Sequence, residues 1–201
     1  TLEDLKVLSF VKDSKLVFVS PDSIRPLSQR VRYNSELQSL DSTVHDYYGM
    51  GKGQIESLNG RKLHDLGFMG QGMTIAVLDA GFMNVDKIAA FRNLNIKGTH
   101  NFVAGYDNDV YKEMDHGTKT LSTIAMNQPT VFVGTAPKAD FWLLRTEDYS
   151  TESPAEEDFW IAAVEFSDSV GVDIISSSLG YHGFDDISMN YRYSDLNGRT
   201  A

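Results

Sequence analysis

Residues 73–82 read Met-Thr-Ile-Ala-Val-Leu-Asp-Ala-Gly-Phe, and this stretch decides the expected fold. Its apolar run is short and contains β-branched residues, which predicts a strand buried on both faces. Asp79 ends the run. A carboxylate in this position is held rigidly and partly shielded from water, so it can orient a histidine. The other interpretation of Asp79 is a side chain that caps the next turn.

Outward from this strand, strand-like and helix-like segments alternate along the chain. Strands are expected at 96–103, 139–144 and 172–177, and helices at 85–91, at 116–126 and from Ser153 onward. In the last helix Ser153 is the expected N-cap, Pro154 fits the first helical position and Glu156 completes a capping box. The expected apolar face of this helix comprises Phe159, Ala162, Ala163, Phe166 and Val170. The alternation predicts an α/β fold, a largely parallel sheet with flanking helices.

Three regions are expected in the 201 residues. Residues 1–20 contain one strand-like run, 15–20, and residues 21–53 are polar and turn-rich, which indicates a linker or N-terminal arm. Residues 54–201 hold the alternating strands and helices.

Composition excludes several classes of function. The net charge of −10 argues against a nucleic-acid partner, because phosphate binding needs clustered Lys and Arg. The absence of cysteine excludes disulfides, thiolate metal sites and a cysteine nucleophile within these residues. No apolar run is long enough to span a membrane, and the first residues do not form a signal peptide.

His116 is the second candidate for chemistry. It opens a predicted helix and is followed by Gly117, which leaves room for a close approach of backbone or substrate. Imidazole exchanges a proton near neutral pH, so His116 can act as a general base, although a histidine near a helix start is often an ordinary surface residue. Functional groups of parallel sheets gather beyond the carboxyl ends of the strands. We therefore expect Asp79, His116 and residues 178–180 to lie at one edge of the sheet.

Four short motifs in a fixed order resemble the subtilisin-like serine peptidases, whose catalytic residues run Asp, His, Ser along the chain. The motifs are Asp79-Ala80-Gly81-Phe82, His116-Gly117-Thr118, Gly134-Thr135-Ala136-Pro137 and Ser178-Leu179-Gly180. The segment from Gln54-Ile55 through Leu63-His64 to Gly72 resembles the family's approach to its aspartate strand, and the match covers roughly residues 47–201.

The resemblance implies a subtilisin-like catalytic domain in residues 54–201 and a role for each motif. Asp79 would orient His116, and His116 would act as general base and acid. Ser178, Leu179 and Gly180 would pair with an extended polypeptide substrate. It also implies a propeptide remnant at residues 1–20 and a secreted or cell-envelope exported hydrolase. Calcium is compatible with the family, but no cofactor or metal ligand is assigned, because the acidic residues at 156–158 and 185–186 lack the spacing of a metal loop.

Two motifs of the family are not found among these 201 residues, namely the Gly-Thr-Ser segment of the nucleophile and the Ala-Gly-Asn run of the oxyanion hole. Ser176, Ser177 and Ser178 lie in or at the end of a predicted strand and lack the glycine-flanked turn that a nucleophile needs. The domain is thus expected to be incomplete. The chain alone should be an inactive N-terminal part, with the remainder of its own domain as a partner and with apolar surface exposed at the edge of its last strand.

Two other classes of function compete with this interpretation. A nucleotide-binding domain needs its glycine fingerprint after the first strand, whereas Gly70 and Gly72 precede that strand. A pseudo-peptidase or binding module of the same fold remains the alternative for Asp79 and His116. The residue in the nucleophile position, further along the protein, would distinguish it from an enzyme. Ser178 has its own alternative, a strand-end serine without a substrate.

Overall fold

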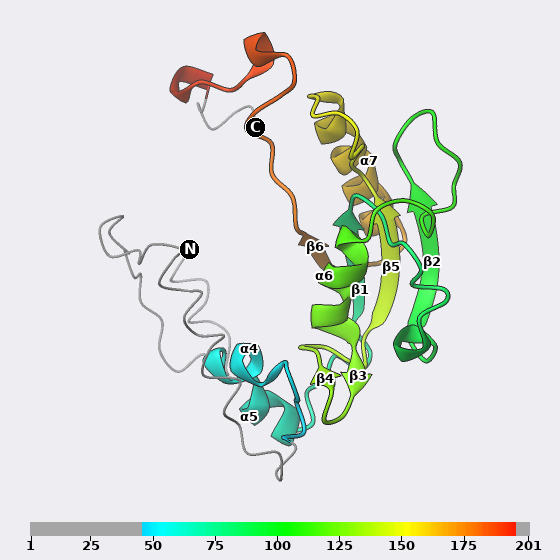
Figure 1. Cartoon of the computed structure of the whole chain (residues 1–201), viewed down its shortest axis with the longest axis vertical. Helices are drawn as coiled ribbons and strands as arrows, with labels where there is room; N and C mark the ends of the chain where they lie inside the picture. The colour runs from blue at the N-terminus through cyan, green and yellow to red at the C-terminus, as the bar shows by residue number, and fades with distance from the viewer. Residues whose placement is uncertain (1–45, 196–201) are drawn as a thin grey trace. The chain divides into compact units, whose positions relative to one another are not determined.

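A computed structural model describes residues 46–195 of the chain, and the expected strand at 15–20 lies outside them. Four parallel strands form the main sheet in the order β2-β5-β1-β6 (Figure 1). Their bounds are β1 (Thr74–Asp79), β2 (Asn95–Asn101), β5 (Asp140–Arg145) and β6 (Ile174–Ser177). The predicted α/β architecture with a largely parallel sheet is therefore confirmed.

β1 lies inside the sheet, and its side chains alternate between two hydrophobic clusters. Ile75 and Val77 belong to the cluster beneath α6 (His116–Ala125), together with Leu121 of that helix. Ala76 and Leu78 belong to the cluster beneath α7 (Ala155–Ser169). Because strand side chains alternate, Asp79 falls on the side of Ile75 and Val77, which is the face that α6 covers.

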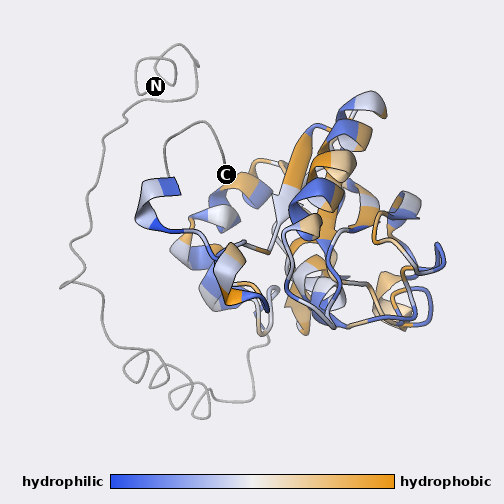
Figure 2. Cartoon of the chain, turned by 90° about the horizontal axis from the view of Figure 1, so that it is seen from above, coloured by the Kyte–Doolittle hydropathy of each residue, from blue (hydrophilic) through white to orange (hydrophobic). Residues whose placement is uncertain are grey.

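α6 and α7 therefore cover opposite faces of the sheet, as a parallel sheet requires. In Figure 2 the helices of the chain carry both hydrophobic and hydrophilic residues, which is the pattern of helices with one face in the core and one in water. α6 begins at His116, as the sequence predicted.

α7 corrects the predicted capping box. The helix begins at Ala155, and no side chain caps its N-terminus. Glu156 accepts a hydrogen bond, 2.8 Å long, from the backbone N–H of Asp148 in the preceding loop, and it also interacts with the backbone N–H of Ser153, which is the glutamate half of the predicted box. The apolar face also differs, since Ala163 and Phe166 pack on the sheet while Ala162 and Val170 are exposed. The predicted face was chosen from apolar residues alone, whereas the buried face of α7 includes the polar residues Glu156 and Ser167.

Several short elements were not predicted. Residues 46–53, expected to have little structure, include Tyr48, which is 2% exposed, an isolated bridge between Gly49 and Phe132, and the start of α4. The additional elements are α4 (Lys52–Ser57), α5 (Gly60–Asp65), β3 (Asn127–Gln128), β4 (Phe132–Val133), η4 (Ile187–Met189) and η5 (Tyr193–Asp195). The helix expected at 85–91 is reduced to η3 (Ala89–Phe91). Segments this short carry too few residues for a periodic pattern.

β6 forms one edge of the sheet within the described range. It pairs with β1 alone, and its isoleucines are unusually open for strand residues, with Ile174 48% and Ile175 38% exposed. This agrees with the expectation that the last strand leaves an unpaired edge and apolar surface.

Candidate active site

The carboxylate of Asp79 is buried and held by three donors. It is 0% exposed, and its Oδ1 accepts a hydrogen bond from the backbone N–H of Ala80 at 2.8 Å. Its Oδ2 accepts from the hydroxyl of Thr120 at 3.2 Å, and the third donor is His116. These contacts from β1 and α6 fix the orientation of the carboxylate.

His116 contacts Asp79 through one ring nitrogen. Nδ1 lies 2.7 Å from Oδ1 of Asp79, and since that oxygen belongs to a carboxylate, Nδ1–H is the donor. The other nitrogen, Nε2, has no hydrogen-bond partner among residues 46–195, and the side chain is 51% exposed. The arrangement thus presents a nitrogen that can accept a proton, at the carboxyl end of the sheet.

Gly117 allows this close approach of α6 to β1. Its backbone N–H donates to the carbonyl of Gly81 at 3.0 Å. A Cβ atom at Gly117 would lie 2.5 Å from the carbonyl oxygen of Gly81 and 2.9 Å from the Cβ of Asp79. Any side chain would therefore push the start of α6, and with it His116, away from the carboxylate.

Residues 178–180 follow β6 at the same edge of the sheet. Ser177 pairs with Leu78 in the register of β6 and β1, so Ser178 comes level with Asp79. Leu179 packs partly against the cluster beneath α7, while a Cβ at Gly180 would meet nothing within 4 Å. The structure thus places these residues at the same edge of the sheet as the Asp79–His116 pair.

Glu147 lies beside the pair and was not predicted as a site residue from the sequence. β5 is the neighbour of β1, and the backbone N–H of Thr146 donates to the carbonyl of Asp79 at 3.1 Å. Glu147 follows directly and is half-buried. Burial, and next the negative charge of Asp79, raise its pKa to about 7. Its position shortly after the strand predicted at 139–144 was the available signal, by the same rule that identified Asp79.

Arg145 supports the loop that carries Glu147. The side chain is 1% exposed, and its guanidinium stacks on Tyr106 at 4.2 Å and lies 5.9 Å from the ring of Tyr149. Its Nε donates a weak hydrogen bond, 3.4 Å long, to the carbonyl of Glu147. Nη2 has no partner in the described part of the chain. The stacking joins the end of β5 to two loops at this edge of the sheet.

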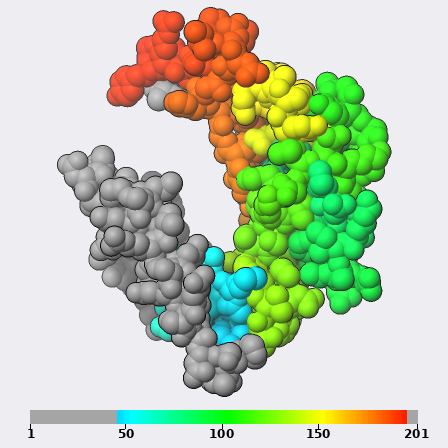
Figure 3. Space-filling view, in the orientation of Figure 1, coloured from blue at the N-terminus to red at the C-terminus, as the bar shows by residue number. Residues whose placement is uncertain are grey.

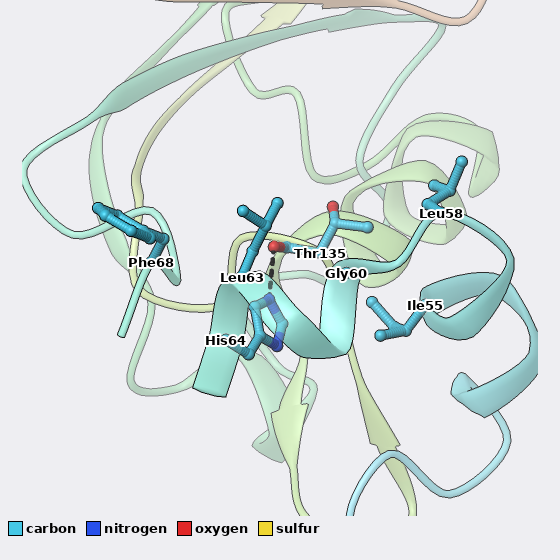
Figure 4. A pocket seen from close by; sticks show the side chains of 7 residues that line it. All are labelled: Ile55, Leu58, Gly60, Leu63, His64, Phe68 and Thr135. Carbon is cyan, nitrogen blue, oxygen red and sulfur yellow. Dashed lines mark hydrogen bonds between the residues drawn. The ribbon is translucent and has the colours of Figure 1, made fainter. Parts of the chain in front are cut away.

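A cavity of about 150 Å³ lies elsewhere in the described part of the chain. It is lined mainly by apolar residues of α4, α5 and the loop after α5, together with His64 and Thr135 (Figure 4). His64 is fully engaged there, since its Nε2 contacts the carbonyl of Thr135 at 2.9 Å and its Nδ1 contacts the hydroxyl of Tyr48 at 3.0 Å. Thr135 binds the backbone of Thr123, near the C-terminal end of α6, so this cavity is remote from His116.

Neither a metal site nor a membrane span is found in the described residues. Across 46–195, no three His, Asp or Glu side chains converge so that they could hold a metal ion, so we assign no calcium ligand there. The helices within this range are too short or too polar to cross a bilayer.

The chain belongs to the subtilase family, because the profile described as Subtilase family matches residues 70–199. It is 27% identical over 181 residues to subtilisin E of Bacillus subtilis (strain 168). The aligned residues make up 90% of this chain and 41% of that protein. It is 30% identical over 127 residues to a subtilisin of Bacillus pumilus, covering 63% of the chain and 44% of the relative. The chain thus spans about two fifths of the length of these subtilisins.

Solved structures of MycP1 are also similar. The structure of MycP1 from Mycobacterium smegmatis is 20% identical with a TM-score of 0.49, over 68% of this chain and 37% of that one. The structure of MycP1 without its N-terminal propeptide is 23% identical with a TM-score of 0.48, over 61% of this chain and 36% of that one.

Proposed function

We propose that the whole protein is a serine endopeptidase in which Asp79 and His116 act with a serine outside these 201 residues. The observation that carries the proposal is the 2.7 Å contact between Nδ1 of His116 and the fully buried carboxylate of Asp79, with Nε2 left open. Membership of the subtilase family, a family of peptidases, supports the same conclusion.

The chemistry follows from the two ring nitrogens of His116. Nε2 takes the proton of the serine hydroxyl as the serine oxygen bonds to the carbonyl carbon of a peptide. The imidazolium then gives that proton to the amide nitrogen as the C–N bond breaks and an acyl-enzyme remains. Water attacks the acyl group with the same proton transfers and restores the serine. Asp79 holds the Nδ1–H tautomer and stabilises the cation throughout.

Residues 178–180 are proposed to hold the polypeptide substrate. An extended peptide can add to this segment as a further strand, so that backbone hydrogen bonds supply affinity and side-chain pockets supply selectivity. The placement of Ser178 level with Asp79, and the open space at Gly180, support this role.

The remainder of the domain is proposed to pack on the edge of β6. Ile174 and Ile175 are exposed there, and burial of such a pair is favourable by about 25 cal/mol per Å² of apolar surface. The serine and the oxyanion donors would come from that remainder, so the 201-residue chain alone should show no turnover. Export from the cell is a further proposal that rests on the resemblance, and fractionation of cells that make the whole protein tests it.

The test is hydrolysis of fluorogenic peptides by the whole protein and by its His116→Ala variant. We expect turnover that a serine-directed inhibitor abolishes and that the substitution removes. The control is Glu165→Ala, because Glu165 is exposed on α7 and outside the residues proposed to act or to bind the substrate. A folded whole protein without turnover, and with a residue other than serine in the nucleophile position, would identify a pseudo-peptidase instead.

A further inference from the structure

Glu147 has an unusual environment for a carboxylate. It is half-buried, yet no hydrogen bond or ion pair joins its side chain to another residue of the range 46–195. A carboxylate removed from water needs a donor or a cation to compensate for its lost hydration. The carboxylate of Asp79, at the end of the neighbouring strand β1, differs in this respect, because it accepts hydrogen bonds from three donors.

The groups around Glu147 make this need stronger. Its pKa is raised by burial and by the negative charges of Asp79, Glu156 and Glu152, and lowered by His116. Tyr181 is a further neighbour of Glu147. Burial, and next the charge of Glu147, raise the pKa of its phenol. Arg145, two residues before Glu147, stacks on Tyr106 instead of pairing with it.

The segment after residue 180 packs against the loop that leads from Glu147 to α7. The segment from Tyr181 onward lies against the loop that precedes α7 (Figure 3). The hydroxyl of Tyr181 donates to the carbonyl of Glu156, and the backbone N–H groups of Asp185 and Glu152 each donate to the other residue. β1 lies between β5 and β6, so a peptide that pairs with residues 178–180 after β6 and reaches His116 over the end of β1 would pass Glu147, which follows β5.

We propose that Glu147 receives a cationic side chain, Lys or Arg, of the polypeptide substrate. This inference rests on the proposed function, because the peptide position is that of residues 178–180 beside His116. A lysine ammonium or arginine guanidinium supplies both the missing donors and the missing positive charge. Glu147 is thus a specificity-determining residue of the site, set apart from the Asp79–His116 pair that carries the proton transfer.

Binding tests the inference independently of turnover. The whole protein carrying His116→Ala, which cannot cleave, is titrated with fluorescent hexapeptides that differ by one Lys-to-norleucine exchange, scanned over the peptide. We expect the lysine peptide to bind at least about tenfold more tightly at one position. Glu147→Gln should bring the two affinities to within about twofold, while Glu165→Gln, an exposed site on α7, should leave the preference unchanged.

Equal affinity of both peptides at every position, or a lysine preference that survives Glu147→Gln, overturns the inference. The first result would mean that another part of the protein pairs with Glu147, and the second that a group other than Glu147 recognises the lysine. Turnover by the unaltered protein is measured separately: a lysine preference without turnover refutes the proposed function alone, and turnover without the preference refutes this inference alone.

The preference should also depend on pH. Glu147 must be ionised to attract a cation, and burial, followed by the charges of Asp79, Glu156, Glu152 and His116, sets how readily it ionises. Tyr181 is a further titratable neighbour, whose pKa Glu147 raises. Because the pKa of Glu147 is raised to about 7, we expect a larger lysine preference at pH 8 than at pH 6. A preference that is the same at both pH values contradicts the assignment to Glu147.

Discussion

Asp79 and Glu147 are two carboxylates that follow neighbouring parallel strands, and the fold treats them in opposite ways. Asp79 is fully buried and accepts three hydrogen bonds, which suits a fixed negative charge that orients His116. Glu147 is half-buried without a partner in the described residues, and its pKa is raised to about 7. The comparison teaches that the donors around a strand-end carboxylate, more than its position, decide what it can do.

The largest effect is expected from removing the charge of Asp79. Asp79→Asn would leave the packing intact but favour the wrong tautomer of His116, so kcat of the whole protein should fall by about 10⁴-fold; the figure is the one known for this substitution in Ser-His-Asp peptidases. Steady-state kinetics on a peptide substrate measures it. Asp115→Asn, an exposed neighbour, is the control, and an equal loss in both variants would contradict a special role of Asp79.

The next largest effect concerns the distance between the two elements of the pair. Gly117→Ala would place a Cβ 2.5 Å from the carbonyl oxygen of Gly81, so α6 must shift. We expect a loss of about 1–3 kcal/mol in the free energy of unfolding, together with a loss of turnover. Urea denaturation measures the first. Gly183→Ala, where a Cβ meets nothing within 4 Å, should change little. Equal stability of the two variants would show that the packing at Gly117 is looser than described.

Glu147→Gln should change how the free energy of unfolding depends on pH. The pKa of Glu147 is raised from 4.5 to about 7, so between these values the folded state keeps a proton that the unfolded state has lost. The free energy of unfolding should therefore fall as pH rises through this window. The variant lacks this loss and should be more stable at pH 8 by about 1–2 kcal/mol, after allowance for solvent screening of a half-exposed group.

Urea denaturation of both proteins at pH 4 and pH 8 measures the difference, and Glu165→Gln serves as the control. A wild-type stability that rises over this range relative to Glu147→Gln would show that Glu147 is paired in the whole protein.

The smallest effect is expected at Thr120, which supplies the longest of the three bonds to Asp79. Thr120→Val removes the 3.2 Å hydrogen bond to Oδ2 and leaves that oxygen without its donor. We expect a loss of about 1 kcal/mol in the free energy of unfolding. Thr123→Val, which removes an exposed bond to the carbonyl of Thr120 in the same helix, should cost less. Equal losses would mean that Oδ2 finds another donor.

The elements that carry Asp79 and His116 could be predicted from the sequence, because each has a strong local signal. The apolar run before Asp79 and the helical pattern after His116 both span enough residues to define a period. Their meeting at one edge then followed from the parallel sheet alone.

Other features depend on contacts that no local pattern contains. Glu156 has the sequence position of a capping residue, yet its carboxylate binds the N–H of Asp148 in the loop before the helix. The raised pKa of Glu147 results from burial and from the charge of Asp79, which is distant in sequence. Tyr48 is buried although its segment is polar, because it packs with Ile55 and Val133 in a separate small cluster.

The most direct test of the paired imidazole and carboxylate is the tautomer of His116. Nitrogen-15 NMR of the histidine side chains, at a pH where imidazole is neutral, reports which ring nitrogen carries the proton. We expect the proton on Nδ1 in the unaltered protein and a changed tautomer balance in Asp79→Asn. A proton on Nε2 in the unaltered protein, or a spectrum of His116 that is unchanged by the substitution, would contradict the hydrogen-bonded Asp79–His116 pair.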